Sequence, residues 1–119
     1  MLHLSPSCRY FYYNGVADMR KGAYSLSGLV RNEMKQHVLS GDVFIFIGRR
    51  GNKIKLLQWD SDGFALYEKG LERGSFERPK QNTAGHFSIS AQQLQHILQG
   101  VILKSIRYKK RFSISSSAV

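Results

Sequence analysis

The amino-acid sequence predicts an α+β fold: a small antiparallel β-sheet, a meander of about four to five strands, packed against one amphipathic helix. A short second helix and a basic, disordered C-terminal tail complete the prediction. Three observations carry it: β-branched and aromatic segments separated by Gly and Asp turns, helical apolar spacing in two segments, and a basic, serine-rich end. A chain of 119 residues fits a single core. We therefore expect one domain over residues 1–104 and a flexible tail over residues 105–119.

The expected strands lie between turn signals. The aromatic segment that ends at Asn14-Gly15 suits a strand. The segment DVFIFIG, the residues RRGN and the partly alternating KIKLLQWD together indicate a β-hairpin with a basic tip. Ser61-Asp62-Gly63 is typical of the next turn, so an antiparallel meander is the economical arrangement. The expected strands comprise residues 8–13, 42–48, 53–60, 64–68 and, at an edge, 87–89.

Two segments carry helical periodicity. From Met19 to Gln36 the apolar spacing predicts one amphipathic helix, and Asp18 stands where its carboxylate would cap the N-terminus. Further along, Ser90-Ala91-Gln92-Gln93 matches a capping box, which predicts a second helix over residues 91–99 that Gly100 closes. The apolar positions of the two helices are Leu26, Leu29, Val30 and Met34, and Leu94, Ile97 and Leu98.

The charge balance favours an anionic partner. Eighteen Lys and Arg residues stand against eight Asp and Glu residues, which gives a formal net charge of +10. No acidic residue follows Glu77, whereas basic residues continue to Arg111. A field of this sign attracts nucleic acid or an anionic membrane surface. The alternative is a basic surface that is merely well solvated.

Cysteine content and hydropathy predict a cytoplasmic location. Cys8 is the single cysteine, so an internal disulfide is ruled out, and its aromatic neighbours indicate a small packed hydrophobe rather than a nucleophile. No stretch approaches the roughly 18 apolar residues of a spanning helix, and the N-terminal residues lack the pattern of an export signal. We expect a soluble, unexported protein without a membrane partner.

The sequence offers no recognisable catalytic, metal or cofactor centre. The four histidines lie far apart, and none has a metal-binding partner at zinc-like spacing. Asp60 and Asp62 are the closest carboxylate pair, and a two-metal nuclease can be imagined around them, but Asp and Gly at this place are typical of a turn. No motif of a nucleotide-binding loop, nucleophile elbow or zinc protease occurs. We therefore expect no enzyme activity, no catalytic residue, no metal and no cofactor.

The feature that stands out is a set of cations on the expected hairpin, followed by aromatic residues. Cations anchor phosphates, and aromatic faces stack on unpaired bases. In a strand, Lys53, Lys55 and Trp59 share one face and would form one exposed surface. The alternative is that Trp59, like Phe64, belongs to the core. The candidate nucleic-acid-binding residues are Arg20, Lys21, Arg49, Arg50, Lys53, Lys55, Trp59, Lys69, Arg73, Lys109, Lys110 and Arg111.

Three segments taken in order resemble a known family. They are DMRKG from Asp18, SGDVFIFIGRRGNKIKLLQWDSDGFALYEKGLERGSF from Ser40 and ISAQQLQHILQG from Ile89. The combination D-M-R-K-G, F-x-F-x-x-R-R-G, K-x-L-x-W-D-x-D-G and L-E-x-G-x-F is similar to the TnpB accessory protein, the second reading frame, of bacterial insertion sequences of the IS-sixty-six family. The resemblance covers about 4–101. It departs at Gly70, where the family usually has a basic residue, and beyond Lys104, where no clear counterpart exists.

The resemblance implies a protein encoded beside a separate transposase and needed with it for movement of the element, in a family not known to carry catalytic residues. We hypothesise a non-catalytic accessory protein that binds DNA, in particular the element ends, and acts with that transposase. The alternative is a protein-protein adaptor that touches DNA only through the transposase, and a small nuclease ranks last. The sequence leaves open whether double-stranded DNA, single-stranded DNA or RNA is bound, and whether the protein dimerises.

Overall fold

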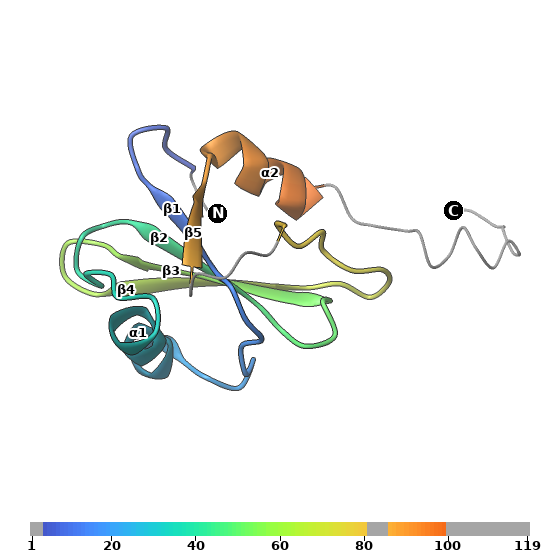
Figure 1. The fold of residues 1–119 in the computed structure, drawn as a ribbon, viewed down its shortest axis with the longest axis horizontal. Coiled ribbons are helices and arrows are strands. Elements are labelled where there is room, and N and C mark those ends of the chain that lie inside the picture. Colours follow the sequence, from blue (N-terminus) through green and yellow to red (C-terminus); the bar gives the residue numbers. More distant parts are fainter. Residues whose placement is uncertain (1–3, 81–85, 100–119) are drawn as a thin grey trace, which may run out of the picture.

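The fold is a five-stranded sheet with a helix on each face. The computed structural model describes residues 4–80 and 86–99. Its strands are β1 (Tyr10–Tyr13), β2 (Val43–Ile47), β3 (Lys53–Trp59), β4 (Phe64–Gly70) and β5 (His86–Ile89), and its helices are α1 (Ala23–Asn32) and α2 (Ala91–Gln99). The strand order is β4-β3-β2-β1-β5, and α1 and α2 cover opposite faces (Figure 1). The predicted α+β class is confirmed, whereas the predicted flexible tail lies outside the described residues.

The sheet is mixed rather than wholly antiparallel. β2, β3 and β4 form the predicted antiparallel meander, in which Leu57 stands opposite Phe44 on one side and Leu66 on the other. β1 runs parallel to β2, with Phe11 opposite Phe44, and β5 pairs antiparallel with the outer edge of β1. The antiparallel prediction is wrong at the pair β1–β2. The chain crosses from β1 to β2 through α1, and a helical crossover returns the chain in its original direction.

Two cores lie on the two faces of the sheet. β2 is buried along its whole length and sends alternate side chains into each core. Leu94 and Ile97 of α2 close one core, and Leu26 and Val30 of α1, with Met34, close the other. These residues were expected on the apolar helix faces, so both amphipathic patterns are confirmed.

Helix α1 is shorter than the predicted segment, and Asp18 does not cap it. The helix begins after Gly22, which makes no side-chain capping hydrogen bond, while Asp18 accepts hydrogen bonds from Arg20. At the other end Lys35 has a left-handed φ of 57°, and the Gln36 N–H donates to the carbonyl of Val30. The apolar spacing continues beyond the helix because the irregular chain still packs against the core.

Two local sequence signals are confirmed. The Ser90 N–H donates to Oε1 of Gln93 at 2.8 Å, and the Gln93 N–H donates to Oγ of Ser90 at 3.0 Å, which is the reciprocal capping box. The Asp60 N–H donates to the carbonyl of Gly63 at 2.7 Å, so Asp60 to Gly63 is the turn between β3 and β4. Among residues 4–80 and 86–99, no helix is long and apolar enough to cross a bilayer.

Candidate nucleic-acid interface

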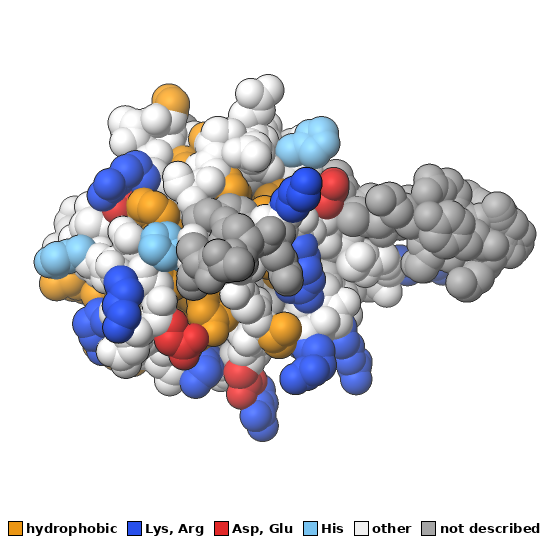
Figure 2. Space-filling view, viewed as in Figure 1, with side chains coloured by type: hydrophobic (Ala, Val, Ile, Leu, Met, Phe, Trp, Pro, Cys, Tyr) orange, Lys and Arg blue, Asp and Glu red, His pale blue; other side chains and the backbone are white. Residues whose placement is uncertain are grey.

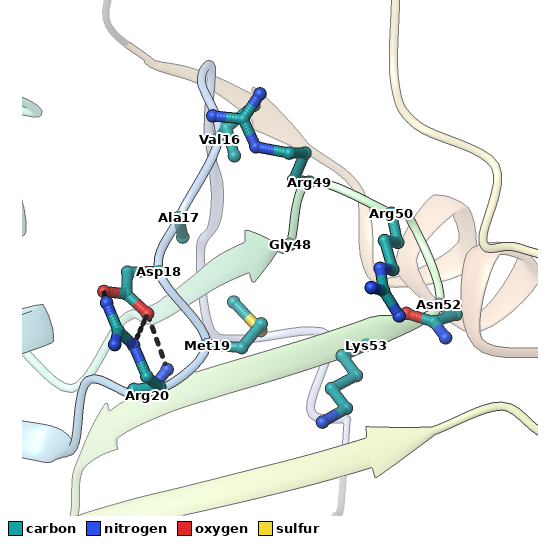
Figure 3. A pocket seen from close by; sticks show the side chains of 10 residues that line it. All are labelled: Val16, Ala17, Asp18, Met19, Arg20, Gly48, Arg49, Arg50, Asn52 and Lys53. Carbon is teal, nitrogen blue, oxygen red and sulfur yellow. Dashed lines mark hydrogen bonds and ion pairs between the residues drawn. The ribbon is translucent and has the colours of Figure 1, made fainter.

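An open pocket of about 530 Å³ lies where β2 turns into β3. Its lining comes from the loop between β1 and α1 and from the tip of the β2–β3 hairpin (Figure 3). We call it the basic pocket, because four of the predicted nucleic-acid-binding residues line it together with one acidic residue, Asp18. These four are Arg20, Arg49, Arg50 and Lys53.

The loop that carries Arg20 is fixed to the sheet. Ala17 bridges to Gly48 in parallel register beyond the end of β2. The side chain of Met19 lies against Gly48 so closely that a Cβ on Gly48 would stand 2.6 Å from Cγ of Met19. Nζ of Lys55 donates a hydrogen bond of 2.8 Å to the carbonyl of Lys21. The DMRKG segment is therefore held against β2 at one end and β3 at the other.

The hairpin tip is held from its other side by residues that follow β4. The Phe76 N–H donates to the carbonyl of Gly51 at 2.8 Å, and Gly51 needs its positive φ of 77° to make this turn. The guanidinium of Arg78 donates to the carbonyls of Gly48 and Arg49. Parts of three motifs that carry the family resemblance, DMRKG, RRG and LERGSF, thus meet at one end of the sheet.

The electrostatics of the basic pocket leave three cations available. Asp18 and Arg20 form an ion pair of 2.9 Å, and the Arg20 guanidinium holds the pKa of Asp18 well below its usual range. Arg49, Arg50 and Lys53 are exposed, and no carboxylate of the described residues forms an ion pair with them. Figure 2 shows Lys and Arg side chains gathered at the lower right, over this end of the sheet. Such a set binds anions, and arginine can do so with two hydrogen bonds at once.

Lys55 and Trp59 depart from the prediction of one exposed surface on β3. Lys55 is only 5% exposed, and its ammonium lies between the carbonyl of Lys21 and a carboxylate oxygen of Glu68 at 3.8 Å. Trp59 is half-buried at the opposite end of β3, about 20 Å from Lys53 at the usual rise per residue. The prediction is wrong because the loop before α1 covers the middle of this strand face.

The other predicted residues that the structure describes do not line the basic pocket. Lys21 is half-buried beside it, and Nζ of Lys69 donates to the carbonyl of Leu98 at 3.4 Å, toward α2. Arg73 is exposed on the turn after β4. The basic residues Lys109, Lys110 and Arg111 lie outside the described residues. Sequence reasoning missed Arg78, since no local pattern marks a side chain that bonds the carbonyls of a distant turn.

The fold and the basic pocket define a small α+β protein with an open pocket lined by cations. The chain belongs to the family whose model is described as IS66 Orf2 like protein, which matches residues 8–108. The resemblance found in the sequence is therefore confirmed, and the match continues past residue 101, where the resemblance ended. Membership indicates an accessory role in the transposition of an insertion sequence, in association with its transposase, and the family is not known as catalytic.

Two relatives from Sinorhizobium fredii are similar over most of their length. Uncharacterized protein y4hO is 36% identical over 101 residues, which cover 85% of this chain and 87% of the relative. Uncharacterized protein y4jC is 27% identical over 92 residues, which cover 77% of this chain and 78% of the relative. No solved structure matches the chain.

Proposed function

We propose that this protein is a non-catalytic DNA-binding accessory of transposition that holds DNA phosphates in the basic pocket. One observation carries the proposal: Arg49, Arg50 and Lys53 of the hairpin tip line one pocket, and none of them is paired with a carboxylate of the described residues. Guanidinium groups match phosphate oxygens in pairs, and release of counterions from DNA drives the binding.

The rigidity of the hairpin tip supports this proposal. Arg49 and Arg50 project from a turn whose backbone is fixed by Arg78 and by the Phe76 N–H. Their side chains contribute little to folding because they are exposed. Rigid backbone beneath free charged side chains reduces the entropy that binding must overcome, which suits a site for phosphates.

The adaptor hypothesis is supported by a different observation. Large apolar side chains are exposed on the α1 side of the sheet, namely Tyr24 at 84%, Leu39 at 49% and Leu66 at 37%. Clustered exposed apolar groups are typical of protein interfaces. An adaptor would bind the transposase through them and would bind DNA only weakly by itself.

A salt series distinguishes the two functions. Affinity for a duplex of the element end, with a scrambled duplex beside it, is measured for wild type, for Arg49→Ala with Arg50→Ala, and for the double lysine variant, and transposition is assayed for each. Loss of two phosphate contacts should lower the slope of log affinity against log salt by about 2 units, and lysine should restore charge but not bidentate geometry. An unchanged slope with transposition abolished would favour the adaptor, and unchanged binding and transposition would refute the site.

A further inference from the structure

A second open pocket, of about 660 Å³, lies at the far end of β3 from the basic pocket. It is bounded by α1, by the residues that follow α1, and by the hairpin that joins β3 to β4. We call it the aromatic pocket. Its lining includes Tyr24, Arg31, Gln36, Leu39, Trp59 and Phe64.

Three aromatic rings form one side of the aromatic pocket, and Phe64 contacts each of the other two. Phe64 lies edge-on between the other two, with its ring centroid 5.1 Å from Trp59 and 6.0 Å from Tyr24. Tyr24 is 84% exposed, although it stands on the helix that covers this core. Core packing therefore accounts for Phe64 but not for the position of Tyr24, which leaves an aromatic ring free to meet a flat ligand.

The two pockets lie close enough for one strand of nucleic acid to occupy both. Arg20 lines the basic pocket and Tyr24 lines the aromatic pocket, and four residues span at most about 14 Å. Met19 of the basic pocket and Phe64 of the aromatic pocket both pack against the core beneath α1. Both pockets therefore open on the α1 side of the sheet.

The polar groups of the aromatic pocket suit a base better than a phosphate. Arg31 offers donors, and the side-chain amide of Gln36, 3.1 Å from a ring nitrogen of His86, offers both a donor and an acceptor. Asp60 and Asp62 are exposed on the turn that follows Trp59 and repel phosphates there. The backbone of a bound strand is therefore directed toward the basic pocket, with a base at the aromatic side.

We propose that the aromatic pocket binds an unpaired nucleobase of the DNA whose phosphates lie in the basic pocket. The ligand is then single-stranded DNA, or a duplex end with unpaired bases, because a base in a continuous duplex cannot offer its face. This inference rests on the proposed function and names its substrate class. An apolar segment of a partner protein is the competing occupant, but it would make no use of the guanidinium at the rim.

The test compares three DNA ligands of equal strand length: a single strand, its blunt duplex, and a strand with abasic sugars that has the same number of phosphates as the single strand. Wild type should bind the single strand more tightly than the abasic strand, and the fluorescence of Trp59, the only tryptophan in the chain, should be quenched by the single strand alone. Tyr24→Ala should lose roughly five- to 150-fold in affinity for the single strand with an unchanged salt slope. Tyr24→Phe is the matched control and should bind like wild type.

The outcomes separate this inference from the proposed function. If wild type binds all three ligands equally with steep salt dependence, DNA binding stands, and the proposal that the aromatic pocket binds a base is refuted. If Tyr24→Ala binds all three ligands as wild type does and Trp59 emission never changes, the aromatic pocket does not bind a base, and a partner protein becomes its expected ligand. If no ligand binds, the proposed function itself fails. Because Tyr24 is mostly exposed, its variants should retain the fold. Trp59→Phe is a second variant, which removes the indole but keeps an aromatic ring in place.

Discussion

Replacing Gly48 by alanine should disturb the basic pocket from beneath. Gly48 is buried at the end of β2, and a methyl group there would stand 2.6 Å from Cγ of Met19. Ordinary contacts between carbon atoms are about 3.5–4.0 Å, so the methyl group lies about 1 Å too close. Because Cγ is near the root of the side chain, Met19 cannot escape by moving its far end alone. The loop that carries Arg20 must move with it.

The expected cost is that of overpacking, about 1–3 kcal/mol of unfolding free energy. Gly28 provides a matched control, since a Cβ there meets nothing within 4 Å. Gly28→Ala lies inside α1 and should instead stabilise the protein by about 0.5–1 kcal/mol. Urea unfolding of both variants measures these differences, and DNA affinity at low salt should fall for Gly48→Ala only.

A double substitution tests the assigned contact directly. With Met19→Ala the clashing atom is gone, so Gly48→Ala should cost about 1 kcal/mol less in that background than in wild type. If Gly48→Ala unfolds like wild type, or costs the same with and without Met19, then Met19 does not lie over Gly48 and the account of the loop is refuted.

Two further predictions concern stability. Ser90→Ala should lower the unfolding free energy by about 1 kcal/mol, because the cap of α2 is lost. Ser25→Ala is the control and should have little effect, because Ser25 is exposed inside α1. Equal urea midpoints for the two variants would contradict the capping role of Ser90. Burial and a hydrogen bond to Glu33 raise the pKa of Tyr13 to about 12 from 10.0, which favours the neutral phenol in the folded state. That stabilisation is complete at pH values below the pKa of Tyr13 in the unfolded state, and it is lost as the pH rises to the pKa of Tyr13 in the folded state. Between about pH 10 and 12, Tyr13→Phe should therefore lose less stability than wild type. Parallel loss in the two proteins would refute the assignment.

Local signals in the sequence predicted most of the elements. The run DVFIFIG became the central strand, and Ser90 with Gln93 formed its capping box, because such patterns depend only on near neighbours. The parallel pairing of β1 with β2 was missed because strand partners are chosen by the whole sheet. A hairpin meander and a helical crossover are built from similar segments.

The candidate site was predicted in its residues but not in its assembly. Arg20, Arg49, Arg50 and Lys53 were all named, yet nothing local showed that two segments would share a pocket. Asp18 was misassigned because a carboxylate before a helix can cap it or bond a nearby arginine, and here Arg20 takes both oxygens. Lys55 was misassigned because alternation gives the face of a strand but not what covers it.

The most direct test of a phosphate site in the basic pocket removes equal charge at two places. Arg49→Ala with Arg50→Ala is compared with Arg73→Ala with Lys80→Ala, since all four side chains are exposed but only the first pair lines the basic pocket. The salt dependence of DNA affinity is measured for both. If phosphates lie in the basic pocket, the slope should fall by about 2 units for the first pair and stay close to wild type for the second. Equal changes in both variants would mean that DNA responds to the overall charge of the protein, and would contradict a phosphate site in the basic pocket.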